Sequence, residues 1–98
     1  MEKEIENYLD NHGRIKQWPS KWIMKTKVLT YLSTKFDDEV HYTEAEVNDI
    51  LKKWHTFNDY FILRRGLIDA GLLKRQLDGS RYWRNPEKSA LKESTDEN

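Results

Sequence analysis

Residues 63–84 read LRRGLIDAGLLKRQLDGSRYWR, and this stretch decides the fold. Leu63 and Leu67 lie one helical turn apart, and Gly71 follows as a residue that ends a helix in a left-handed conformation. Two short segments that mix apolar or aromatic residues with basic ones, 72–77 and 80–84, then flank Asp78-Gly79. This dipeptide is a strong signal for a tight β-hairpin turn in which both residues take positive φ. The stretch therefore predicts a helix followed by a hairpin.

The sequence predicts three helices before the hairpin, and the last of them includes the helical part of this stretch. The nearest begins after Asn58, a good helix cap, and runs to Ala70. The one before it begins with Thr43-Glu-Ala-Glu46, a capping box, and continues to Trp54. A longer helix is predicted from Lys21 to Phe36 with Ser20 as its cap. Residues 40–42 are predicted as a short strand or an extended link.

The two ends of the chain have a different character. Ile5, Tyr8, Leu9 and His12 recur at helical spacing, so residues 1–12 are predicted to form an additional N-terminal helix. Residues 13–85 are predicted to form the main domain. Residues 86–98 are polar, and we expect them to be a disordered tail.

Composition limits the classes of function. The chain has 98 residues, no cysteine, and 17 basic against 17 acidic side chains. This length supports one domain with a modest core, and the absence of cysteine excludes disulfides, thiol nucleophiles and zinc–cysteine sites. No apolar run is long enough to span a membrane, and the acidic N-terminus does not resemble a secretory signal. We therefore expect a cytoplasmic protein without membrane contact.

The zero net charge conceals an uneven distribution. Residues 1–13 carry −3, residues 14–84 carry +5 and residues 85–98 carry −2. A basic body between two acidic ends does not exclude a phosphate partner, although an average of zero suggests otherwise. The acidic ends either solubilise the chain or compete with a phosphate ligand for the basic body.

The order helix, short strand, helix, helix, hairpin is that of a winged helix-turn-helix. The expected fold class is α+β, mostly α, with an added N-terminal helix and a C-terminal hairpin wing. Four stretches resemble a small bacterial domain family of unknown function, found alone or C-terminal to ArsR-type DNA-binding domains. These stretches are GRIKQWPSK (13–21), YTEAEVN (42–48), LRRGLIDAGLLKR (63–75) and DGSRYWR (78–84). The resemblance implies a transcription-regulatory context and supplies no ligand or catalytic role.

The leading functional hypothesis is binding of double-stranded DNA. In a helix-turn-helix, the outer face of the third helix enters the major groove, and Arg65 on that face is suited to guanine or phosphate. Arg64 lies nearer the core edge and suits backbone phosphate or an internal carboxylate. Asp69 opposes DNA unless it pairs with Arg65 one turn away. The hairpin adds basic candidates that also protect a sheet edge from aggregation. These candidates are Lys74, Arg75, Arg81 and Arg84.

The alternative hypothesis is a protein-interaction or dimerisation module. Phe61 and Ile62 are large and apolar beside Arg65, whereas members of the resembling family tend to carry small residues just before the Leu-Arg-Arg sequence. Such side chains suit thymine methyl groups, a partner protein or a second copy of the chain. A further possibility is that the N-terminal helix covers them, which would autoinhibit DNA binding or form a dimer.

The remaining aromatic and titratable residues suggest no other chemistry. Trp18, Trp22 and Trp54 are predicted core residues, and Tyr82 and Trp83 are predicted either to cover the core or to stack on bases. The histidines lack metal-ligand spacing, and no phosphate loop or catalytic triad order is present. We therefore expect no catalytic, metal or cofactor site. The operator, the effector and the oligomeric state do not follow from the sequence.

Overall fold

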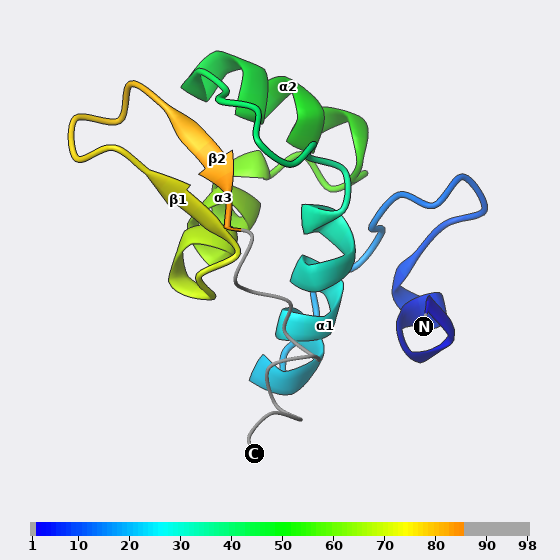
Figure 1. Cartoon of the computed structure of the whole chain (residues 1–98). Helices are drawn as coiled ribbons and strands as arrows, with labels where there is room; N and C mark the ends of the chain where they lie inside the picture. The colour runs from blue at the N-terminus through cyan, green and yellow to red at the C-terminus, as the bar shows by residue number, and fades with distance from the viewer. Residues whose placement is uncertain (1, 86–98) are drawn as a thin grey trace.

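A computed structural model describes residues 2–85, in which three α-helices and a two-stranded hairpin follow a short 3-10 helix (Figure 1). The small, mostly helical α+β fold predicted from the sequence is confirmed, and its arrangement is consistent with a winged helix. No helix in this described part of the chain has the length and apolar character needed to cross a membrane. The elements are η1 (Glu2–Tyr8), α1 (Trp22–Ser33), α2 (Glu44–Lys53), α3 (Tyr60–Asp69), β1 (Leu73–Arg75) and β2 (Tyr82–Arg84).

The core lies where α1, α2 and α3 meet the hairpin. Helix α3 packs against α1, α2 and β1, so the predicted recognition helix is also the centre of the fold. The predicted core role of Trp18 and Trp54 is confirmed in part, since both are half-buried against the core. Trp22 is instead 54% exposed, because it occupies the outer face of the first turn of α1. The fully buried aliphatic side chains are Ile15, Val28, Leu29, Leu32, Val47, Leu51, Leu63, Leu67, Leu72 and Leu73.

Helices α2 and α3 are joined by a short turn that a buried histidine holds together. The His55 Nδ1–H donates to the Leu51 carbonyl at 2.6 Å, and Nε2 accepts from the Asp59 backbone N–H at 2.8 Å. The Asp59 side chain then caps α3 by accepting from the Ile62 N–H. The predicted cap at Asn58 is therefore wrong by one residue, because Asn58 adopts a left-handed φ of 56° that a short amide side chain tolerates.

The other helix starts differ in how well local sequence predicted them. The capping box of α2 is confirmed, with the Thr43 hydroxyl accepting from the Glu46 N–H and the Glu46 carboxylate accepting from the Thr43 N–H. The predicted cap of α1 at Ser20 is wrong. Lys21 occupies that position and its side chain makes no capping hydrogen bond, since Pro19 ahead of it is fully buried and fixes the entry of the chain.

The hairpin pairs Leu73 with Arg84 and Arg75 with Tyr82 in antiparallel register. Its other edge forms a single bridge between Tyr42 and Tyr82, which confirms an extended segment near residues 40–42. The predicted two-residue turn is wrong. Residues 77–80 form a four-residue loop closed by the Gln76 N–H and the Arg81 carbonyl, and of the Asp78-Gly79 pair only the glycine has positive φ.

The N-terminal segment lies against α1 and away from α3 (Figure 1). It forms a 3-10 helix that ends at Tyr8, whereas an α-helix over residues 1–12 was predicted. Leu9 bridges to Ile15 and so ends the helix early. Ile5 is buried, and Glu4 accepts from the Lys27 ammonium at 3.1 Å. The predicted tail, residues 86–98, lies outside the described residues.

Candidate nucleic-acid interface

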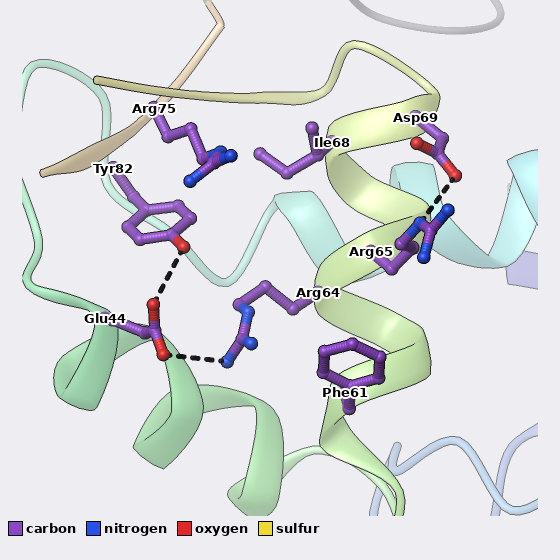
Figure 2. Close-up of a pocket in the computed structure, with 8 residues that line it drawn as sticks. All are labelled: Glu44, Phe61, Arg64, Arg65, Ile68, Asp69, Arg75 and Tyr82. Atoms are coloured by element: carbon purple, nitrogen blue, oxygen red, sulfur yellow. Dashed lines mark hydrogen bonds and ion pairs between the residues drawn. The ribbon is translucent and has the colours of Figure 1, made fainter. Parts of the chain in front are cut away.

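A groove of about 420 Å³ lies between α3, the start of α2 and the hairpin (Figure 2). In a helix-turn-helix protein with a wing, this is the region that faces a duplex. The lining of the groove combines charged side chains with the apolar side chains of Phe61 and Ile68. Its lining residues are Glu44, Phe61, Arg64, Arg65, Ile68, Asp69, Arg75 and Tyr82.

The two adjacent arginines of α3 have different surroundings. Arg64 exposes 15% of its side chain, donates from Nη1 to the Asn48 amide oxygen at 2.5 Å and lies 3.6 Å from a Glu44 oxygen. Its guanidinium also lies 5.3 Å from the centre of the Phe61 ring. Arg64 therefore ties α3 to α2, which agrees with the predicted internal-carboxylate role rather than with a free phosphate ligand.

Arg65 exposes 69% of its side chain and points away from the core (Figure 2). Its Nε lies 3.6 Å from an Asp69 oxygen one turn along α3, as the sequence spacing predicted. Both partners are largely exposed, so this pair contributes little to stability and a competing anion can displace it. Arg65 is therefore the α3 arginine that is available to a ligand.

The hairpin presents three cations whose charged groups have no hydrogen-bond or ion-pair partner among the described residues. Lys74, Arg75 and Arg81 are exposed, and none of their side chains forms a hydrogen bond or ion pair with another residue in the described range 2–85. Arg84, the fourth hairpin candidate, instead donates to the Asp38 carboxylate at 3.3 Å and is largely covered. The structure thus brings Arg65 and Arg75 to one groove and leaves Arg84 as a tie to the segment after α1.

Tyr82 also lines the groove, and its ring is buried while its hydroxyl reaches Glu44. The hydroxyl donates to the Glu44 carboxylate at 3.2 Å, so the α2 N-terminus, α3 and the hairpin meet at this carboxylate (Figure 2). Burial raises the pKa of the Tyr82 phenol above its ordinary value, and the Glu44 contact raises it further. Tyr82 is therefore a neutral, covered side chain rather than a free stacking platform.

Phe61 and Ile62 do not share one exposed apolar face. Ile62 is half-buried against the core, while Phe61 is 55% exposed at the groove margin. Of the alternatives that the sequence left open, cover by the N-terminal segment is not observed, because that segment packs on α1 and Phe61 stays exposed. The tip of the hairpin provides a second exposed apolar side chain, Leu77, which is 100% exposed.

Comparison with known families places this arrangement in context. A family model described as an uncharacterized protein conserved in bacteria (DUF2087) matches residues 14–84, which is most of the chain and all of α1 through β2. The chain belongs to the DUF2087 family. The whole groove lies inside the matched DUF2087 region, whereas η1 precedes it. No curated protein and no solved structure matches the sequence significantly.

Two histidines of this DUF2087 domain pack against other residues of the fold. His41 stacks on Trp83 with ring centres 5.0 Å apart, and His55 is buried in the turn before α3. Within residues 2–85, no group of three or more histidine, aspartate or glutamate side chains is arranged to hold a metal ion. The groove residues that the sequence did not single out are Glu44 and Ile68, and it also missed Asn48, which binds Arg64 outside the groove lining, since only the packing of α2 on α3 brings these residues together.

Proposed function

We propose that this DUF2087 domain is a cytoplasmic, transcription-regulatory module that binds double-stranded DNA through α3 and the hairpin wing. The observation that carries the proposal is the set of three exposed hairpin cations that form no hydrogen bond or ion pair within residues 2–85, one of which, Arg75, lines the groove together with Arg65. The resemblance of the sequence to domains that accompany ArsR-type DNA-binding domains supports the regulatory context.

The distribution of charge supports a phosphate ligand. Cations that lack internal partners keep counterions or water in solution, and contact with DNA phosphates releases those counterions. Lys74, Arg75 and Arg81 extend along the hairpin, where a wing contacts the DNA backbone. Arg65 exchanges its weak contact with Asp69 for a guanine edge or a phosphate. Four cations on two adjacent elements suit a backbone-dominated mode of binding.

Two of the predicted contact residues take a supporting role in this proposal. Arg64 holds α3 against α2, and Arg84 holds β2 against Asp38. Both side chains are mostly covered and already paired, so they fix the distance between the recognition helix and the wing. Replacement of Arg64 or Arg84 is therefore expected to weaken DNA binding mainly by altering the shape of the interface rather than by removing a phosphate contact.

The test is the binding of a fluorescein-labelled duplex of mixed sequence, followed by anisotropy at low salt. Arg75→Gln and Arg81→Gln are each expected to weaken binding about five-fold, the equivalent of one lost charge contact. Lys52→Gln is the matched control, because Lys52 is an exposed cation in the last turn of α2 and does not line the groove. Equal affinity of all three variants would overturn the proposed surface.

A second candidate function is a protein-interaction or homodimer module, favoured by the exposure of Phe61 and Leu77. Light scattering of the wild type and of Phe61→Asp separates the two functions. A wild-type dimer that Phe61→Asp dissociates, with no duplex binding by either protein, supports the interaction module. A monomer that binds the duplex supports the DNA-binding module.

A further inference from the structure

We infer that a second hollow, at the end of α2 remote from Glu44, binds a small aromatic anion. Its volume is about 430 Å³, and its lining residues are His12, Arg14, Lys53 and Trp54. This inference is independent of DNA binding, because none of these residues lines the groove beside α3.

The hollow combines an apolar surface with positive charge. The half-buried indole of Trp54 provides the apolar part, and the four lining residues include two permanent cations and no acid. A third cation, the Lys35 ammonium, lies 4.0 Å from the centre of a Trp54 ring, and the Lys53 ammonium lies 5.8 Å from it. Flat apolar ligands pack on the indole ring, and the nearby cations favour binding of such ligands when they carry a negative charge.

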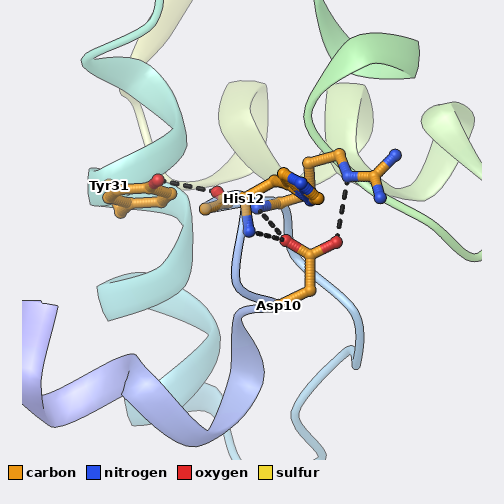
Figure 3. Close-up of polar contacts among 5 residues, drawn as sticks. Asp10, His12 and Tyr31 are labelled. Carbon is orange, nitrogen blue, oxygen red and sulfur yellow. Dashed lines mark hydrogen bonds and ion pairs between the residues drawn. The ribbon is translucent and has the colours of Figure 1, made fainter.

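The turn that supplies His12 and Arg14 is held by Asp10. The carboxylate of Asp10 accepts from the His12 backbone N–H at 2.9 Å, from the Arg14 backbone N–H at 2.8 Å and from Arg14 Nε at 2.9 Å (Figure 3). These hydrogen bonds, led by that from the Arg14 backbone, lower the pKa of the Asp10 carboxyl. Asp10 engages only Nε of Arg14, so the terminal amino groups of that guanidinium have no partner among the described residues.

The same turn is locked against the aromatic side of the hollow. The Tyr31 hydroxyl donates to the Gly13 carbonyl at 2.7 Å (Figure 3). Gly13 has φ +78°, and a β-carbon there would lie 2.9 Å from the Tyr31 hydroxyl and 3.7 Å from the Trp54 ring. Only glycine lets the turn approach so closely. The wall formed by the His12–Arg14 turn is therefore preorganised, since hydrogen bonds within the protein fix it without a ligand.

The position of the hollow gives the ligand access to the helix-turn-helix itself. Trp54 ends α2, and its carbonyl accepts from the Ile15 N–H at 2.8 Å. The Thr56 N–H in turn donates to the Ile15 carbonyl at 3.0 Å, so the segment after Arg14 is paired with the α2–α3 turn. A ligand that contacts Arg14 and Trp54 touches both partners of this pairing.

The probe is naphthalenesulfonate, added to the isotopically labelled full chain and followed through the tryptophan indole N–H signals in proton–nitrogen correlation spectra. The Trp54 signal is expected to shift saturably, with a Kd on the order of 1 mM for a ligand of this size. The signal of exposed Trp22 is an internal control for nonspecific contact and is expected to stay in place. Neutral naphthalenesulfonamide and methanesulfonate are each expected to bind at least about five-fold more weakly, because each lacks one half of the recognition.

Lys53→Gln and Lys52→Gln form a matched pair, since both remove one cation from the last turn of α2 and only Lys53 lines the hollow. Lys53→Gln is expected to weaken naphthalenesulfonate binding about five-fold, and Lys52→Gln to leave it unchanged. An absent Trp54 shift at roughly ten times the expected Kd would overturn the inference. An equal response of Trp22, equal binding of the neutral analogue or an equal effect of the two lysine variants would also overturn it.

Discussion

Replacement of Arg64 by Met removes the charged link between α2 and α3 while it retains most of the aliphatic packing. The Arg64 guanidinium donates to Asn48 at 2.5 Å and is mostly covered, and a hydrogen bond that involves a charged group contributes about 1.5–3 kcal/mol. The Glu44 carboxylate at 3.6 Å is half-exposed, so this ion pair adds less than about 1 kcal/mol. We expect Arg64→Met to lower the free energy of unfolding by about 2 kcal/mol and Tm by roughly 8–16 °C.

Arg65→Met is the matched control, because it makes the same substitution at the next position of the same helix. Arg65 is largely exposed, so we expect Arg65→Met to change the free energy of unfolding of the protein by no more than about 0.5 kcal/mol. Urea unfolding followed by tryptophan fluorescence measures both variants, with the m-value as a check on two-state behaviour. Equal stability of Arg64→Met and Arg65→Met would refute the assignment of Arg64 as an interhelical tie.

A double-mutant cycle isolates the hydrogen bond itself. Asn48→Ala is expected to be coupled to Arg64→Met by at least about 1 kcal/mol, since each change leaves the other partner without its contact. Additive effects would mean that packing of the arginine stem, rather than the Asn48 contact, stabilises this interface.

Three further predictions concern the core and the hairpin. Gly66→Ala is expected to destabilise the fold by about 1–2 kcal/mol, because the new methyl group would lie 3.2 Å from a Leu29 methyl carbon. Urea unfolding measures this change, and a gain in stability would show that α1 and α3 can separate at no cost. Thr43→Ala is expected to cost about 1 kcal/mol through loss of the α2 cap, and an unchanged Tm would contradict that role. The Tyr82 phenol has a pKa raised above 10.0 in the folded chain. The neutral phenol therefore stabilises the fold fully below pH 10, and this contribution is lost as the pH rises through the raised pKa. Tyr82→Phe should lose less stability than the wild type between neutral and strongly alkaline pH.

Local sequence predicted the elements whose signals act over a few residues. The Thr43–Glu46 capping box sets the start of α2, and the spacing of Leu63 and Leu67 identifies the buried face of α3. The pairing of Arg65 with Asp69 also follows from helical spacing alone. In each case the partners lie within one turn of each other, so no knowledge of the tertiary fold was needed.

The features that the sequence missed depend on contacts between distant segments. Helical spacing predicted an α-helix through His12, but the bridge between Leu9 and Ile15 ends η1 at Tyr8. Arg64 is distinguished from exposed Arg65 by its contact with Asn48, which lies 16 residues before Arg64 in the chain. The hollow beside Trp54 depends on tertiary packing in the same way.

The length of the hairpin loop could not be predicted from its dipeptide. Asp78-Gly79 favours a two-residue turn, yet the Asp78 carboxylate accepts from the Ser80 N–H and Gly79 donates to Gln76. These contacts stabilise a four-residue loop, in which Leu77 faces solvent instead of continuing the buried side of β1. Because the two-residue turn and the four-residue loop are both stabilised by local hydrogen bonds, the sequence pattern did not distinguish them.

The salt dependence of duplex binding is the measurement that tests DNA binding through α3 and the wing most directly. Four cations are available to phosphates, namely Arg65, Lys74, Arg75 and Arg81, so the logarithm of the binding constant should fall against the logarithm of salt concentration with a slope of about −2 to −4. A variant that carries Arg75→Gln and Arg81→Gln together should have a slope shallower by about 2. A slope that these two substitutions leave unchanged, or no duplex binding at low salt, would contradict the proposed interface.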